Sequence, residues 1–188
     1  DREAKKEMPR SLKEIMLSTI KAKLEENAIR SILLIDYAKG FFSYELAQEI
    51  INIARKQNIT TIVDPKPQNI SYFKHCSVIR PNRKETEDIT RINYDGMAST
   101  LEKMAKKLAN TTGSPYAIIS CGEDGLFVYD RNNKDKKGKT KMMPTRAREI
   151  SDIVGAGDTL VAVLSLGLIN GLNIYDAAEL ANYASGIV

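Results

Sequence analysis

Histidine and cysteine are scarce in this chain of 188 residues, which has one histidine, two cysteines and no tryptophan. Cys76 and Cys121 lie far apart without a Cys-x-x-Cys pattern, and His75 has no second histidine to form a cluster. A structural zinc site, a Cys-His dyad and a Ser-His-Asp triad are therefore poorly supported. We expect both cysteines to be reduced, partly buried thiols of a cytoplasmic protein.

Long apolar runs are missing as well. No segment approaches the roughly 18–20 apolar residues that cross a bilayer, so we expect no membrane partner. Residues 1–7 contain neither the apolar core of a secretory signal nor an initiator methionine. We interpret this start as a fragment boundary.

Excess charge of one sign is absent too, because the formal net charge is only +4. The densest basic stretch, residues 134–141, has no aromatic residues between its lysines. Binding to single-stranded nucleic acid normally combines basic and aromatic side chains. We therefore interpret this stretch as a solvated hairpin tip, and nucleic acid is not an expected partner.

Short apolar runs alternate with amphipathic segments along the chain, and 43% of the residues are hydrophobic. We predict strands at 31–35, 59–63, 77–79, 116–120 and 126–129, and helices at 11–26, 43–54, 95–110 and 160–169. The continuous apolar run 31–35 is typical of a strand covered on both faces. The alternation predicts one α/β domain with right-handed crossovers and a mainly parallel sheet, interrupted by an antiparallel hairpin within 125–150.

Polar residues follow the predicted strands at 36–40, 64–66, 81–85 and 121–125. In an open α/β sheet, ligands bind at the carboxyl ends of the strands. The mixture of carboxylates, lysines, amides and glycine suits a phosphorylated ligand. Lys39 and Lys66 would then face an anion, although both could be surface lysines, and Asp64 before Pro65 could be an ordinary turn residue.

The most informative segment is residues 152–159, which precedes the apolar helix. Gly155, Ala156 and Gly157 are small enough to let successive backbone N–H groups converge on an oxyanion at the positive end of a helix. Asp158 could accept the proton of an attacking hydroxyl during phosphoryl transfer. The alternative is a tight turn followed by a helix-capping aspartate. The segment lacks the Gly-Lys-Ser/Thr of a Walker P-loop.

The pattern Asp152-x-x-Gly155-Ala156-Gly157-Asp158-Thr159 resembles the C-terminal signature of the ribokinase/PfkB family of ATP-dependent sugar kinases. The resemblance covers the whole chain and is closest to the heptose-phosphate kinases. Five further words match in order: Asp36–Gly40, Asp64–Lys66, Pro81–Glu85, Met143–Glu149 and Ala181–Gly186. Ile153 and Val154 stand where the family usually has threonine, so a side-chain hydroxyl is absent there.

The resemblance implies a ribokinase-like three-layer α/β/α fold with a mainly parallel sheet and an antiparallel hairpin. Residues 1–188 would form part of one kinase domain, without the N-terminal lid region and the end of the last helix. The small-molecule partners would be ATP and a sugar phosphate, with Mg²⁺ and K⁺ as cofactors, and the complete protein would be a homodimer. This 188-residue chain alone would have little activity.

The resemblance also assigns roles to individual residues. Asp158 would be the catalytic base, and Gly155, Ala156 and Gly157 the anion hole. The ATP-binding residues would be Asn82, Arg83, Lys84, Glu85, Ser120, Gly122, Gly125 and Asn182. Substrate would contact Asp36, Lys39, Asp64 and Lys66. Glu85 would hold Mg²⁺, partly through water, and Asp152 a monovalent cation.

The implied reaction is phosphorylation of the anomeric hydroxyl of D-glycero-β-D-manno-heptose 7-phosphate, for lipopolysaccharide core synthesis. Two alternatives stay open: a kinase for another sugar or a nucleoside, and an inactive nucleotide-binding fragment. Asn82 and Glu85 also have a purely structural interpretation, because they could cap a helix that begins at Arg83.

Overall fold

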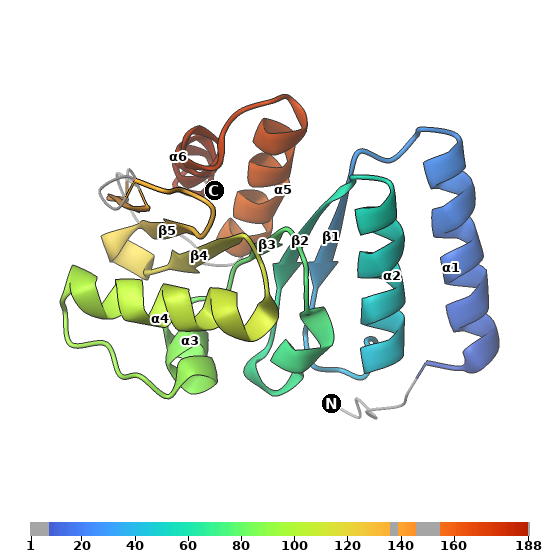
Figure 1. The fold of residues 1–188 in the computed structure, drawn as a ribbon, viewed down its shortest axis with the longest axis horizontal. Helices are drawn as coiled ribbons and strands as arrows, with labels where there is room; N and C mark the ends of the chain where they lie inside the picture. Colours follow the sequence, from blue (N-terminus) through green and yellow to red (C-terminus); the bar gives the residue numbers. More distant parts are fainter. Residues whose placement is uncertain (1–7, 136–138, 146–154, 188) are drawn as a thin grey trace.

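A six-stranded sheet forms the centre of the computed structural model, which describes residues 8–135, 139–145 and 155–187 (Figure 1). The spatial order equals the chain order: β1 (Ser31–Ile35), β2 (Thr60–Asp64), β3 (Val78–Ile79), β4 (Tyr116–Ser120), β5 (Leu126–Asp130) and β6 (Thr140–Met143). Strands β1 to β4 are parallel, whereas β5 is antiparallel to β4 and β6 to β5. The predicted mainly parallel sheet with an antiparallel hairpin is confirmed.

Helices cover both faces of this sheet and complete a three-layer fold (Figure 1). One face carries α2 (Tyr44–Lys56) and α4 (Ala98–Thr112), with α1 (Arg10–Glu25) outside α2 and α3 (Arg83–Thr90) beside α4. The other face carries α5 (Ala156–Ile169) and α6 (Ile174–Ser185), which pack against each other. Two short 3₁₀ segments, η1 (Pro67–Phe73) and η2 (Gly122–Asp124), follow β2 and β4.

The pleat of the strands divides the core in two, because successive side chains point to opposite faces. In β4, Ala117 and Ile119 join the cluster beneath α2 and α4, whereas Ile118 joins the cluster beneath α5 and α6. All three are fully buried. This two-sided burial explains why the sequence shows short continuous apolar runs instead of alternating ones.

Strand β1 departs from the expectation of a strand covered on both faces. Only Leu34 in it is buried, and the other four residues are half-buried. The reason is position: β1 lies at the edge of the described sheet and pairs only with β2 among the described strands. Helix α1 is also loosely covered, since Leu12 and Ile15 are 50% and 60% exposed.

Helix α4 starts later than predicted, at Ala98. Asp95 lies before it, and its Oδ1 accepts a hydrogen bond from the backbone N–H of Met97. A carboxylate that binds nearby backbone N–H groups favours a turn over a helix interior. In the described ranges, no helix is long and apolar enough to cross a membrane.

Candidate phosphoryl-transfer site

The carboxyl ends of the four parallel strands lie together at one end of the sheet, next to the first turn of α5. Parallel pairing aligns these ends, and loop hydrogen bonds tie them together. The Asp36 N–H donates to the Asp64 carbonyl (2.9 Å), and the Ser120 N–H donates to the Pro81 carbonyl (3.2 Å). The polar segments that follow the strands are thus gathered in one place, as the sheet rule predicts.

Helix α5 begins directly after Gly155, which is its N-cap and has a positive φ of +98°. That conformation is strained for a residue with a Cβ, so glycine suits the position. Asp158 lies exposed in the first turn, and the Tyr37 hydroxyl from the loop after β1 donates to its Oδ2 (3.5 Å). The turn presents N–H groups, a helix positive end and a carboxylate together. Asp152 lies outside the described residues.

Asp36 is buried, and both of its carboxylate oxygens accept hydrogen bonds from the protein. Oδ1 accepts from the Ala38 N–H (2.8 Å), while Oδ2 accepts from the Asn69 amide (2.9 Å) and the Lys66 N–H (3.3 Å). These bonds fix the loop after β1 against η1. Lys39, on the same loop, is exposed.

Asn82 and Glu85 form the capping box that their spacing also predicts. Asn82 Oδ1 accepts from the Glu85 N–H (2.8 Å), and Glu85 Oε2 accepts from the Asn82 N–H (2.9 Å). Glu85 Oε1 lies 2.6 Å from the Lys66 ammonium, and this hydrogen bond raises the pKa of Lys66. The structural interpretation of Asn82 and Glu85 is therefore confirmed as the local function of both side chains.

An open cavity of about 560 Å³ lies beside this pair, between the start of η1 and α3. Glu85, Asp88, Lys66, Lys84 and Arg91 are the charged residues of its lining. Arg83 points elsewhere: its guanidinium pairs with Asp124 of η2 (2.9 Å) and lies over the Tyr94 ring. Acidic and basic groups thus surround one cavity at the strand ends, which suits a phosphate with a cation.

Asp64, Arg80 and Ser120 link the ends of β2, β3 and β4. Arg80 Nη1 donates to Asp64 Oδ2 (2.7 Å), and Nη2 donates to Ser120 Oγ (3.2 Å). Burial raises the pKa of the Asp64 carboxyl, while the Arg80 charge opposes that shift. The sequence reasoning assigned no role to Arg80, although its position directly after a predicted strand was a usable signal.

Gly125 closes the segment after β4 with a positive φ of +94° and very tight surroundings. A Cβ placed on it would lie 2.0 Å from the Met143 carbonyl oxygen and 2.6 Å from the Thr145 nitrogen. Gly122 also has a positive φ, of +61°, but nothing lies within 4 Å of its Cβ position. Asn182 of α6 is buried and donates to the Pro144 carbonyl (2.8 Å), so it holds the end of β6.

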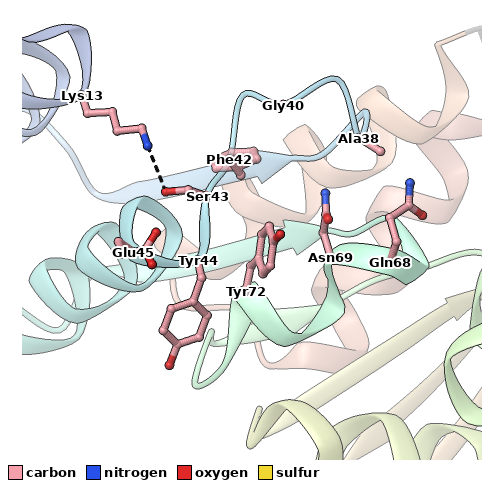
Figure 2. Close-up of a pocket in the computed structure, with 10 residues that line it drawn as sticks. All are labelled: Lys13, Ala38, Gly40, Phe42, Ser43, Tyr44, Glu45, Gln68, Asn69 and Tyr72. Atoms are coloured by element: carbon pink, nitrogen blue, oxygen red, sulfur yellow. Dashed lines mark hydrogen bonds between the residues drawn. The ribbon is translucent and has the colours of Figure 1, made fainter. Parts of the chain in front are cut away.

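A second hollow, of about 420 Å³, lies on the α2 side of the loop after β1 (Figure 2). Lys13 reaches across from α1 and donates to Ser43 Oγ (3.3 Å), and Ser43 caps α2. Tyr44 and Tyr72 line the side nearest η1 (Figure 2). None of the predicted site residues lines this hollow, so we assign it no part in the reaction.

The described residues contain no group of three His, Cys, Asp or Glu side chains that could hold a metal ion directly. Glu85 is one carboxylate with both oxygens already engaged. Mg²⁺ needs few protein ligands, because it usually keeps several waters and binds through one or two carboxylates plus substrate phosphates. The residues present therefore fit Mg²⁺ that arrives with a nucleotide and meets Glu85 through water.

The chain belongs to the pfkB carbohydrate kinase family, because the model of that family matches residues 22–188. Among curated relatives, the bifunctional protein HldE of Aliarcobacter butzleri is 37% identical over 167 residues, or 88% of this chain and 33% of that protein. HldE of Helicobacter pylori strain G27 is 34% identical over the full chain and 39% of its own length. The chain thus spans 33–39% of the length of these two relatives.

Solved structures share the fold at lower identity. Phosphofructokinase-2 of Escherichia coli, in complex with potassium, superimposes with a TM-score of 0.72 at 19% identity, over 90% of this chain and 54% of that one. Ribokinase of Arabidopsis thaliana, complexed with ribose and ATP, gives a TM-score of 0.66 at 15% identity, over 82% and 48%. The expected ribokinase-like fold is confirmed.

Proposed function

We propose that this chain carries the nucleotide-binding and phosphoryl-transfer part of an ATP-dependent sugar kinase. The observation that carries the proposal is the first turn of α5, where Asp158 follows the glycine-containing cap and faces Tyr37 from the loop after β1. A hydroxyl placed between these elements would lie beside both a base and a ring of N–H donors. That combination supports proton removal and stabilises charge on the transferred group.

The acceptor in this proposal is the anomeric hydroxyl of D-glycero-β-D-manno-heptose 7-phosphate, and the product is the 1,7-bisphosphate. The support is the similarity to HldE proteins at 34–37% identity together with the lysines near the strand ends. Asp158 would take the proton of the hydroxyl as its oxygen bonds to the γ-phosphorus and the bond to ADP breaks. Mg²⁺, when bound, neutralises charge on the ATP phosphates.

The remaining roles in this proposal come from the family resemblance. Gly155, Ala156 and Gly157 bind the transferred phosphoryl group, and Glu85 contacts Mg²⁺ through water. Ser120, Gly122 and Gly125 lie on the segment that approaches ATP. Asp36 and Asn182 act by holding loops in place, because both Asp36 carboxylate oxygens and the Asn182 amide nitrogen are engaged within the protein. Asp152 and K⁺ stay a proposal from the family resemblance.

The test is ADP release by the protein expressed from the full reading frame that encodes this chain. Asp158→Asn is expected to lower kcat by at least about 100-fold, because a positioned base contributes roughly 10²–10⁴-fold. Calorimetry should show ATP binding retained, since the substitution keeps the size of the side chain. Turnover within tenfold of wild type would overturn the role of Asp158.

A panel of acceptors decides the substrate. The heptose 7-phosphate is expected to give the highest kcat/KM, with ribose, fructose 6-phosphate and a nucleoside as competitors. Preference for a sugar without phosphate would contradict the heptose-phosphate proposal and favour another kinase of the family. ATP binding without turnover on any acceptor would favour a nucleotide-binding fragment. Light scattering of the same protein tests the proposed homodimer.

A further inference from the structure

Arg80 is a buried cation at the centre of the site. It is the first residue after β3 and only 7% exposed. Its backbone N–H donates to the Val63 carbonyl (2.8 Å), and its guanidinium reaches Asp64 on one side and Ser120 on the other. Its Nε has no hydrogen-bond partner among the described residues.

The terminal edge of this guanidinium lies against the first turn of α5. A Cβ placed on Gly157 would lie 3.4 Å from both Nη1 and Nη2 of Arg80. Gly157 is helical and does not have a positive φ, so backbone conformation does not require glycine there. At that distance a Cβ would be in van der Waals contact with the guanidinium, so the Arg80 side chain packs directly against the turn at Gly157.

Burying a charged pair is costly, and such pairs are weak contributors to stability. The Arg80–Asp64 pair lies directly beneath the turn that our proposed function assigns to phosphate. A guanidinium has five N–H donors in a fixed fork, and two of them satisfy Asp64 and Ser120. The fork therefore joins three strand ends, packs against one helix terminus and places under that terminus a positive charge that is paired with Asp64.

We propose that Arg80 is the positioning residue of phosphoryl transfer: it holds the turn Gly155–Gly157 in place against β2 and β4 and adds its charge to the underside of the anion hole. This inference rests on the proposed kinase function. Arg80 acts through Gly157 and not by touching substrate in this arrangement. Its effect belongs to the transition state, where charge builds up on the transferred group.

The first test compares Arg80→Met and Arg80→Lys in the protein from the full reading frame. Arg80→Met keeps the length of the side chain but removes charge and fork, and is expected to lower kcat about 100-fold, the loss typical of one oxyanion-hole donor. Arg80→Lys keeps the charge but cannot hold Asp64 and Ser120 together. Its kcat should therefore be roughly tenfold higher than that of Arg80→Met and still below that of wild type. The KM for ATP should change less than threefold in both.

Two controls separate this role from a structural one. Leu164→Ala opens a cavity under the same helix and lowers stability, but it is expected to leave kcat unchanged at temperatures where the protein is folded. Arg10→Met removes an arginine from an exposed pair with Glu14 and should change neither stability nor kcat. If Arg80→Met keeps kcat within threefold, or if Leu164→Ala loses as much, the proposal is wrong.

A second measurement does not depend on kinase activity. Inorganic phosphate is expected to raise the Tm of the 188-residue chain, and Arg80→Met should abolish that rise while Arg10→Met retains it. If the wild-type protein turns over no sugar, the proposed function fails and this measurement alone decides the role of Arg80. A phosphate-induced rise of equal size in Arg80→Met would overturn it. If Arg80→Met does not fold, Arg80→Lys replaces it: its kcat is expected to fall about tenfold, and an unchanged kcat together with an unchanged phosphate-induced rise would overturn the role.

Discussion

The ammonium nitrogen of Lys66 lies 2.6 Å from Glu85 Oε1, so the carboxylate proposed to meet Mg²⁺ is held by a cation from the neighbouring strand end. The other oxygen of Glu85 caps α3. One side chain thus serves a helix terminus, an ion pair and the expected metal. Lys66 is 40% exposed at its side chain and also lines the cavity beside Glu85.

Glu85→Gln is expected to raise the Mg²⁺ concentration for half-maximal ADP release about tenfold, the lower range for losing a group that supports a metal site. The free energy of unfolding should change by less than about 1 kcal/mol, because the amide oxygen can still accept from the Asn82 N–H and a partly exposed ion pair contributes little. Magnesium titration and urea unfolding measure the two effects.

Two variants complete that experiment. Asp88→Asn removes a negative charge from the same cavity lining without touching the capping box, and its Mg²⁺ dependence should match wild type. Glu85→Ala loses the cap as well and should cost about 1 kcal/mol more than Glu85→Gln. An unchanged Mg²⁺ requirement in Glu85→Gln would remove Glu85 from the metal site.

Gly125→Ala should destabilise the chain by more than about 3 kcal/mol, because strained backbone and overpacking each cost roughly 1–3 kcal/mol. The Cβ would meet the Met143 carbonyl oxygen at 2.0 Å, and backbone atoms cannot turn aside as a flexible side chain can. Gly122→Ala is the matched control with a positive φ in open space, and should cost about 1 kcal/mol. Similar urea midpoints for the two variants would contradict the close contact between β6 and the segment after β4.

Cys76 and Cys121 should react slowly with a thiol reagent at pH 8 in the folded chain and rapidly in urea. Burial raises the pKa of the Cys76 thiol from 9.0 to about 12 and that of Cys121 to about 11. Only the thiolate is a nucleophile, so both thiols are protected by burial and by protonation. Rapid labelling of two thiols in the folded chain would contradict the buried positions.

The same pKa shifts predict an alkaline loss of stability. Between about pH 9 and pH 11–12 the unfolded chain releases thiol protons that the folded chain keeps, so the folded state loses stability as pH rises. Cys76→Ala and Cys121→Ala should flatten this slope, measured as the free energy of unfolding against pH. An identical slope in the double variant would assign the loss to other groups.

Much of the fold was predictable because local signals agree. Each buried strand is a short apolar run, and each run ends at Asp, Arg or Ser next to turn-forming residues, as at Asp64-Pro65. Ser43 marks the start of α2, where it accepts a hydrogen bond from the Leu46 N–H. The exposure of β1 was not predictable, since whether a strand lies at an edge depends on its neighbours and not on its own residues.

The candidate site also has a part that the sequence predicts and a part that it does not. The glycines of residues 155–157 and the Asp158 beside them are contiguous, so the sequence alone indicates an anion-binding turn with a carboxylate. The pairing of Lys66 with Glu85 and of Arg80 with Asp64 joins residues 16–19 positions apart on different strand ends. No local pattern distinguishes such partners from ordinary surface charges.

The scarcity of cysteine and histidine, the alternating apolar runs and the turn at residues 155–158 are properties of the sequence by itself, and they predict an α/β protein with a helix terminus suited to an anion. Tertiary structure decides that Arg80 lies under Gly157 and that Glu85 both caps α3 and holds Lys66. The physical reason is that propensity and capping act within a few residues. Burial and charge pairing, in contrast, depend on which strand ends the sheet brings side by side.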